Sequence, residues 1–307
     1  MPGKKKKDDI QQFSLFLSDN LIQLSEDLKG YKYQHGPYQA FRINDPKPRQ
    51  IHKSSVRDRL LHHAVYRVLY PFFERTFISD SFSCRLKKGT HKAMARFRQF
   101  AYEVSRNHTQ TCWMLKCDIR KFFENIHHHV LVDILSGYVP DRDIMALLEN
   151  IIRSFSAGPG RGLPLGNLTS QLFVNVYMNE FDQFMKHRMK AKYYIRYADD
   201  FVIFSHDKNW LMELTPKIAE FLEEELKVQL HPNKIYIKTI YSGLDFLGWK
   251  HFPDHRTLRP ATQRRMFKRI TKDNHPAVLA SYRGLISHGN TRKLASRVDE
   301  LAKSKKP

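Results

Sequence analysis

Apolar residues recur at helical spacing over long stretches of the chain. From Val56 to Phe73 they repeat every three or four positions, whereas the opposite face carries arginine and histidine. This pattern predicts a helix, and Pro71, which lacks the backbone N–H that a helix uses, is expected to end it. A basic turn over 81–93 precedes the next expected helix, and Asn167 suits the N-cap of a later one. Further helices are predicted up to about 106, near 128–138 and 141–154, from about 167 to 189 and from 211 to 226.

Other segments have the character of strands. The apolar run TCWMLKCDI (111–119) predicts a buried strand that ends at Asp118. In YYIRYADDFVIFS (193–205), two β-rich runs meet at the polar pair Asp199–Asp200, which predicts a hairpin. Strand-like pieces follow at 234–240 and 244–252, and the stretch 259–307 is again helical in pattern. The absence of a repeat or a low-complexity linker favours one continuous, multi-lobed body.

Composition adds a strong positive charge to this picture. The 307 residues include 52 Lys or Arg and 31 Asp or Glu, for a net charge of +21. Such a surplus favours a polyanionic partner, and nucleic acid is the usual one. An anionic membrane surface is the rival partner, but no apolar run reaches the roughly 18 residues that span a bilayer, and no membrane partner is expected. The three cysteines have no zinc-site spacing, which suits a reducing cytoplasm. The start MPGKKKKDDI is interpreted as a solvated tail, with an RNA-contacting arm or a nuclear-type basic patch as the alternatives.

Three carboxylates are the candidate reactive groups. Asp118 ends one apolar strand, and Asp199 and Asp200 occupy the tip of the expected hairpin. An Asp-Asp pair alone is more often a turn, but apolar neighbours on both sides place this one at a sheet rim, where unpaired charge is costly. Side by side, the three would form an oxygen-rich site for two Mg²⁺ ions, which prefer oxygen ligands and share them with phosphates. Such a pair of ions suits an in-line displacement at phosphorus.

Seven motifs follow one another over roughly residues 50–255: VRDRLLHHAV, FSCRLKKGTH, LKCDIRKFFENI, GLPLGNLTSQLFVNVYMNEFD, YIRYADDFVIF, LHPNKIYI and LDFLGW. In content and in order they resemble the motifs of reverse transcriptases. The resemblance implies an α+β right-hand polymerase fold, with an antiparallel palm sheet backed by helices. The implied division is an N-terminal basic tail and helical segment (1–50), fingers (51–110), a palm (111–255) with a fingers insertion near 128–166, and a helical basic thumb (256–307).

The resemblance also implies roles for single residues. Asp118 and Asp199 match the principal metal-binding aspartates, with Asp200 as the weaker third and Ile119 offering a backbone carbonyl. The metal would be Mg²⁺, as two ions, with Mn²⁺ as a substitute. Phe123 matches the aromatic gate that excludes a ribose 2′-hydroxyl.

Further residues are implied to lie near the incoming nucleotide. Arg85 matches a fingers arginine that contacts the triphosphate, and Lys234 matches a lysine near the site. Arg57, Lys87 and Lys88 are weaker candidates, since each is equally well explained as a solvated surface charge.

One departure from the common family pattern narrows the resemblance. Most members carry Gln-Gly in the loop before the long helix and end the motif Ser-Pro, whereas this chain has Leu165-Gly166 and ends in Gln171. A leucine cannot make the polar contacts of that glutamine, so base-pair checking should loosen. The pattern L-G-x-x-x-S-Q resembles the reverse transcriptases of diversity-generating retroelements. That resemblance implies an RNA template, a DNA or RNA primer, dNTPs, errors at template adenines and a small basic accessory protein.

Two alternatives remain open. One is another bacterial reverse transcriptase, of the phage-defence, retron or group II intron type. The other is a non-catalytic RNA-binding scaffold, which intact Asp118, Asp199, Asp200 and Phe123 argue against. In each case the expected location is the cytoplasm of a bacterium, with the protein encoded by the bacterium or a phage.

Overall fold

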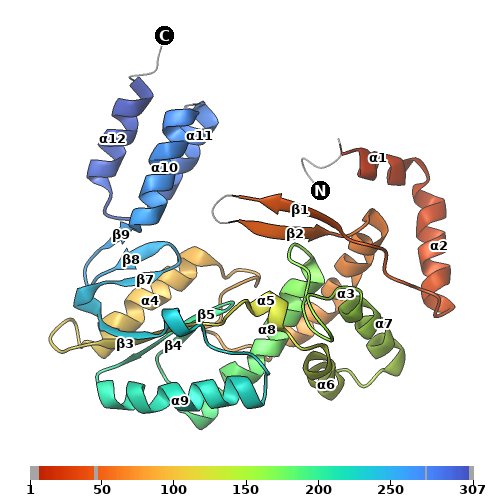
Figure 1. Ribbon diagram of the computed structural model, residues 1–307, viewed down its shortest axis with the longest axis horizontal. Coiled ribbons are helices and arrows are strands. Elements are labelled where there is room, and N and C mark those ends of the chain that lie inside the picture. Colours follow the sequence, from red (N-terminus) through yellow and green to blue (C-terminus); the bar gives the residue numbers. More distant parts are fainter. Residues whose placement is uncertain (1–6, 45–47, 274, 304–307) are drawn as a thin grey trace.

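A four-stranded antiparallel sheet lies at the centre of the computed structural model, which describes residues 7–44, 48–273 and 275–303 (Figure 1). The strand order is β4-β5-β3-β6, and the strands are β4 (Tyr194–Tyr197), β5 (Asp200–Ser205), β3 (Trp113–Asp118) and β6 (Tyr236–Thr239). Because side chains alternate along a strand, Leu115 and Cys117 pack into the larger hydrophobic core, whereas Met114 faces the opposite side.

Helices cover both faces of this sheet. The larger core lies against helices on one side, and α8 is buried along most of its length. The opposite face packs on α4 through aromatic contacts such as Phe97 with Phe204, whose ring centroids lie 4.9 Å apart. The helices around the sheet are α3 (Val56–Glu74), α4 (Thr90–Val104), α5 (Phe122–Asn125), α6 (His128–Tyr138), α7 (Arg142–Arg153), α8 (Leu168–Gln183), which continues into η1 (Phe184–Arg188), and α9 (Lys208–Glu224).

Two further parts rise from this layer on opposite sides of the view in Figure 1. Near the N-terminus, α1 (Asp8–Leu15) and α2 (Leu17–Lys29) precede a hairpin of β1 (Gln39–Ile43) and β2 (Arg49–Lys53). Toward the C-terminus a small sheet leads into three helices with a core of their own. Its elements are β7 (Leu244–Phe246), β8 (Trp249–His251), β9 (Arg256–Leu258), α10 (Pro260–Lys272), α11 (Pro276–Ile286) and α12 (Arg292–Lys303), preceded by η2 (Pro232–Lys234) and η3 (Ile240–Ser242).

The structure confirms the predicted helices, the hairpin and the N-cap at Asn167, with one correction. Pro71 does not end α3 but lies inside it: the proline is exposed, while the neighbours Tyr70 and Phe73 are buried and hold the last turn in place. Asn167 is the N-cap of α8, but its side chain makes no capping bond. It donates instead to the carbonyl of His52, at 2.9 Å, and accepts from Ser54.

The expected division into parts stays a prediction. Its boundary at residue 50 falls within β2, and its boundary at 255 falls between two paired strands, β8 and β9. Residues 1–6 of the expected solvated tail lie outside the described residues. Over the described part of the chain, no helix combines the length and apolar character needed to cross a membrane.

Candidate active site

The three carboxylates meet at one end of the central sheet. Asp118 is the last residue of β3 and lies directly opposite Asp200, the first residue of β5. Asp199 belongs to the turn between β4 and β5, and its carbonyl accepts a hydrogen bond of 3.1 Å from the backbone N–H of Ile119. Residues far apart in sequence are therefore brought together by strand register and by one cross-strand bond.

Two lysines supply the positive charge at this end of the sheet. The Nζ of Lys234 lies 2.8 Å from the Oδ1 of Asp118, so the lysine predicted near the site does contact it. Lys116 forms an ion pair with Asp200 and is almost fully buried. Burial lowers the pKa of Lys116 to about 8, because the charged form loses hydration.

Sequence reasoning missed Lys116, although a signal for it was present. It precedes Asp118 by two residues in a strand, and strand residues two apart point to the same face. A lysine in an otherwise apolar run, on the face that carries the aspartate, needs a charged partner.

The acidic groups are crowded. Burial and then the neighbouring charge of Asp118 raise the pKa of Asp199 above its ordinary value. Burial and the charge of Asp118 both disfavour the ionised form of Asp199, and a cation bound between the carboxylates would stabilise that form.

The donor chemistry of the site fits a hard divalent cation. Within the described ranges, no three His, Cys, Asp or Glu side chains are already arranged as a metal site. The ligands on offer are carboxylate oxygens, which Mg²⁺ prefers, and lysine ammonium groups now neutralise two of them. Asp118, Asp199 and Asp200 are thus the residues that would hold such a metal, after exchange of their lysine partners.

A loop joins the predicted gate residue to the residue that departs from the family pattern. The backbone N–H of Leu163 donates to the carbonyl of Phe123 at 2.8 Å. Two residues later, the carbonyl of Leu165 accepts from the N–H of His52 on β2, at 3.0 Å. The hydrogen bond to β2 therefore fixes the position of this loop. Because Leu163 bonds to Phe123 and Leu165 bonds to β2, the segment 163–165 links the predicted gate residue to β2.

Gly166 can lie this close to β2 because it has no side chain. A Cβ at Gly166 would lie 2.8 Å from Cγ2 of Ile51, and its φ of +108° is one that side-chain-bearing residues rarely adopt.

The arginines predicted to bind triphosphate have other partners. The Arg85 side chain is 3% exposed, and its guanidinium pairs with both carboxylate oxygens of Glu74, at 2.9 and 2.7 Å. It also donates to the carbonyls of Ile78 and Ser81. Arg57 pairs with Asp27 of α2 at 2.5 Å. Triphosphate binding by either arginine stays a prediction, and it requires an exchange of partners.

The weaker candidates are also accounted for. Lys88 donates to the carbonyl of Ser79 at 2.6 Å, and Lys87 has a φ of +59° in the same turn. Gln171 lines a hollow of about 720 Å³ together with Arg85 and residues of α3. Gln171 and Arg85 thus line the same hollow.

Behind the aspartate turn lies a buried ion pair that the sequence pattern did not indicate. Arg196 of β4 is 1% exposed and contacts both carboxylate oxygens of Asp182 on α8, at 2.8 and 2.6 Å. The hydroxyl of Tyr194 donates to the same carboxylate at 2.7 Å. Arg196 also donates to the carbonyl of Ala198, the residue before Asp199. This network ties the turn to α8.

Comparison with known sequences gives a consistent result. Residues 43–251 match the family model described as reverse transcriptase (RNA-dependent DNA polymerase). Protein YkfC of Escherichia coli (strain K12) is 26% identical over 285 residues, which cover 79% of this chain and 72% of that protein. The group II intron-encoded protein LtrA of Lactococcus lactis subsp. cremoris is 22% identical, over 82% of this chain and 52% of its own length. This chain thus spans about half the length of that intron-encoded relative.

Solved structures support the fold. Apo telomerase from Candida tropicalis, truncated from its C-terminal domain, superposes with a TM-score of 0.57 at 13% sequence identity. The match covers 78% of this chain and 60% of the telomerase chain. The predicted α+β right-hand polymerase fold is confirmed.

Proposed function

This chain belongs to the reverse transcriptase family of RNA-dependent DNA polymerases, and on that premise we propose that it copies RNA into DNA at the Asp118–Asp199–Asp200 site with low fidelity. The enzyme class predicted from the sequence, an RNA-directed DNA polymerase, is confirmed by the family match. The observation that carries the proposal is the pairing of Asp118 with Asp200 across β3 and β5, with Asp199 in the adjoining turn.

The residues of the site divide the work between them. Asp118, Asp199 and Asp200 would hold two divalent cations, Mg²⁺ or Mn²⁺, with the carbonyl of Ile119 as a further ligand. When bound, these ions would activate the primer 3′-hydroxyl and stabilise the leaving pyrophosphate. Lys234, which donates to Asp118 at 2.8 Å, would exchange that contact for a phosphate of the incoming dNTP. Phe123 would close the side of the pocket that faces the sugar.

The loop supports low fidelity. Leu165 and Gly166 are fixed by β2 and offer no polar side chain to an incoming base, so a mismatched pair loses no hydrogen bond there. With Gln171 at the end of the motif, this pattern supports a reverse transcriptase of a diversity-generating retroelement. Its partners would be an RNA template, a primer, dNTPs and a small basic accessory protein. Its location would be the bacterial cytoplasm, and its parts the fingers, palm and thumb expected above.

A second candidate is a reverse transcriptase of the group II intron type. The similarity to LtrA, over 82% of this chain, favours it. The two candidates share the chemistry and differ in where errors fall.

The deciding experiment is extension of a DNA primer on a defined RNA template with Mg²⁺ and four dNTPs, followed by sequencing of the product. The wild type would be compared with Asp199→Asn and with Asp133→Asn, which removes an exposed carboxylate from α6. We expect synthesis by the wild type and Asp133→Asn, and none by Asp199→Asn, with errors concentrated opposite template adenines.

Other outcomes are equally informative. Evenly distributed errors or accurate copying would favour the intron-type candidate. Full activity of Asp199→Asn would overturn the site. RNA binding without synthesis on any template, even with an accessory protein added, would favour the non-catalytic scaffold.

A further inference from the structure

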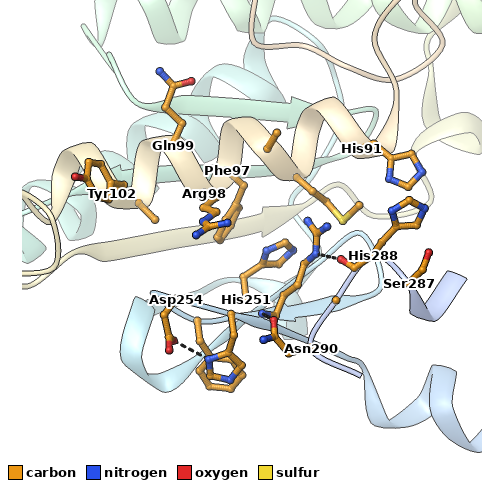
Figure 2. A pocket seen from close by; sticks show the side chains of 17 residues that line it. His91, Phe97, Arg98, Gln99, Tyr102, His251, Asp254, Ser287, His288 and Asn290 are labelled. Carbon is orange, nitrogen blue, oxygen red and sulfur yellow. Dashed lines mark hydrogen bonds and ion pairs between the residues drawn. The ribbon is translucent and has the colours of Figure 1, made fainter. Parts of the chain in front are cut away.

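A second cavity lies where α4, the β8–β9 turn and the α11–α12 turn meet (Figure 2). Its volume is about 760 Å³, which is in the range of sites for small organic ligands. None of the residues that line it belongs to the carboxylate site.

The lining is rich in groups that bind anions. Arg98 extends from α4 into the cavity, and Arg256 lies near enough to Arg98 for the two charges to repel. Three histidines also line the cavity: His91 and His288 have ring centroids 4.1 Å apart, and His251 lies on β8, where burial lowers its pKa to about 4 and keeps the ring neutral. Among the lining residues only Asp254 is acidic, and it is paired with His255 at 2.7 Å. The cavity therefore carries excess positive charge.

Arg98 has no partner of its own among the residues that the structure describes. The buried Arg85 and Arg196, by contrast, are each paired with a carboxylate, that of Glu74 and that of Asp182. Two guanidinium groups that line one cavity suit a phosphate ligand, because the planar, multi-donor group matches phosphate oxygens.

Arg256 is held in place before any ligand binds. Its Nε–H donates to the carbonyl of His288, and its own carbonyl accepts from the N–H of Asn290 at 3.0 Å. The turn can approach this closely because of Gly289, where a Cβ would lie 2.1 Å from Cζ3 of Trp249. With Nε engaged, the Nη groups of Arg256 remain for a ligand.

The cavity also has surfaces for more than a phosphate. The Phe252 and His255 rings are stacked, with centroids 4.6 Å apart and an interplanar angle of 10°. Tyr102 of α4 also lines the cavity (Figure 2), and Met94 and Phe97 of the same helix add apolar surface to it. Aromatic faces beside arginine suit a nucleotide base next to its phosphate.

We propose that this cavity is a second nucleotide-binding site of the protein, which takes the phosphate of one nucleotide unit between Arg98 and Arg256. The unit has two sources, a nucleotide within an RNA strand or a free mononucleotide. The site is distinct from the polymerase site and does not depend on its chemistry.

The test compares Arg98→Gln with Lys92→Gln in the full chain. Both substitutions remove one exposed positive charge from α4, but Lys92 does not line the cavity. Binding of a fluorescently labelled single-stranded RNA would be measured by anisotropy at several salt concentrations without divalent metal. If the phosphate comes from a strand, Arg98→Gln should reduce the slope of log K against log[salt] by about 0.7, the value for one phosphate contact, and Lys92→Gln should not.

A second arm identifies a free ligand. If the site takes a mononucleotide, AMP but not adenosine should raise the melting temperature of the wild type and of Lys92→Gln, and not that of Arg98→Gln. Either result supports the site. Equal behaviour of the two variants in both arms would overturn it. Primer extension by Arg98→Gln on saturating primer-template should match the wild type, which separates this site from the polymerase function.

Discussion

At the residue scale, Leu165 is a clear departure from the family pattern, because an apolar side chain stands where most members carry a glutamine. Its backbone is fixed by His52 on β2, so a substitution there changes the side chain in a constant setting. We predict that Leu165→Gln lowers the misincorporation frequency about 3- to 10-fold, which corresponds to one hydrogen bond of about 1 kcal/mol. Sequencing of cDNA made on one template measures it. Leu165→Met, which keeps an apolar side chain, should leave the errors as they are. An unchanged error frequency in Leu165→Gln would contradict the role given to this residue.

Gly166 provides a structural test of the same loop. We predict that Gly166→Ala lowers the free energy of unfolding by about 1–3 kcal/mol. The alanine would have to adopt a positive φ that is unfavourable for it, and its methyl group would lie too close to Ile51. Gly89→Ala is the matched control: Gly89 has a similar φ of +101°, and a Cβ there meets nothing within 4 Å. Urea unfolding measures both variants. An equal loss in the two would show that the contact with Ile51 has no consequence.

At the element scale, the sequence predicted the helices and strands, because these depend on the local pattern of apolar and polar residues. The strand that ends at Asp118 and the hairpin around Asp199 follow from period-two alternation and apolar runs, so the meeting of the carboxylates was predictable. The partners of charged residues were not. Arg85 was expected to contact a triphosphate, but it is buried and pairs with Glu74. That partner lies eleven positions away, at the end of α3, and the local pattern around Arg85 does not indicate it. The pairing of Arg196 with Asp182 likewise depends on how β4 packs on α8.

The Arg196–Asp182 pair therefore gives a prediction about elements. Arg196→Met would leave the buried Asp182 carboxylate without its cation and should cost about 3–5 kcal/mol of unfolding free energy. The double variant Arg196→Met, Asp182→Leu removes both charges and should recover most of that loss. Urea unfolding of the wild type, the single variant and the double variant tests this. If the double variant is as unstable as the single one, the cost comes from lost packing and not from the stranded charge.

At the scale of the whole molecule, buried histidines connect its stability to pH. His62 lies in α3 among the N-terminal elements, and burial followed by the charge of His35 lowers its pKa to about 4. His251 lies in β8 at the other side of the protein, and burial lowers its pKa to about 4 as well. Both side chains are almost fully buried. Protonation of either places a charge where water cannot solvate it.

The sign of the pH dependence follows from these values. Below pH 6.5, the ordinary histidine pKa, these two histidines bind protons in the unfolded chain but not in the folded one. The contribution of each histidine to stability is therefore fully present above pH 6.5 and is lost as the pH falls toward 4. A shift of this size corresponds to about 3 kcal/mol per histidine. We predict a fall in unfolding free energy between pH 7 and pH 5 by urea titration, and a smaller fall in His62→Gln. His206→Gln, which removes an exposed histidine, should follow the wild type. If His62→Gln loses as much stability as the wild type over this range, His62 is not a source of the pH dependence.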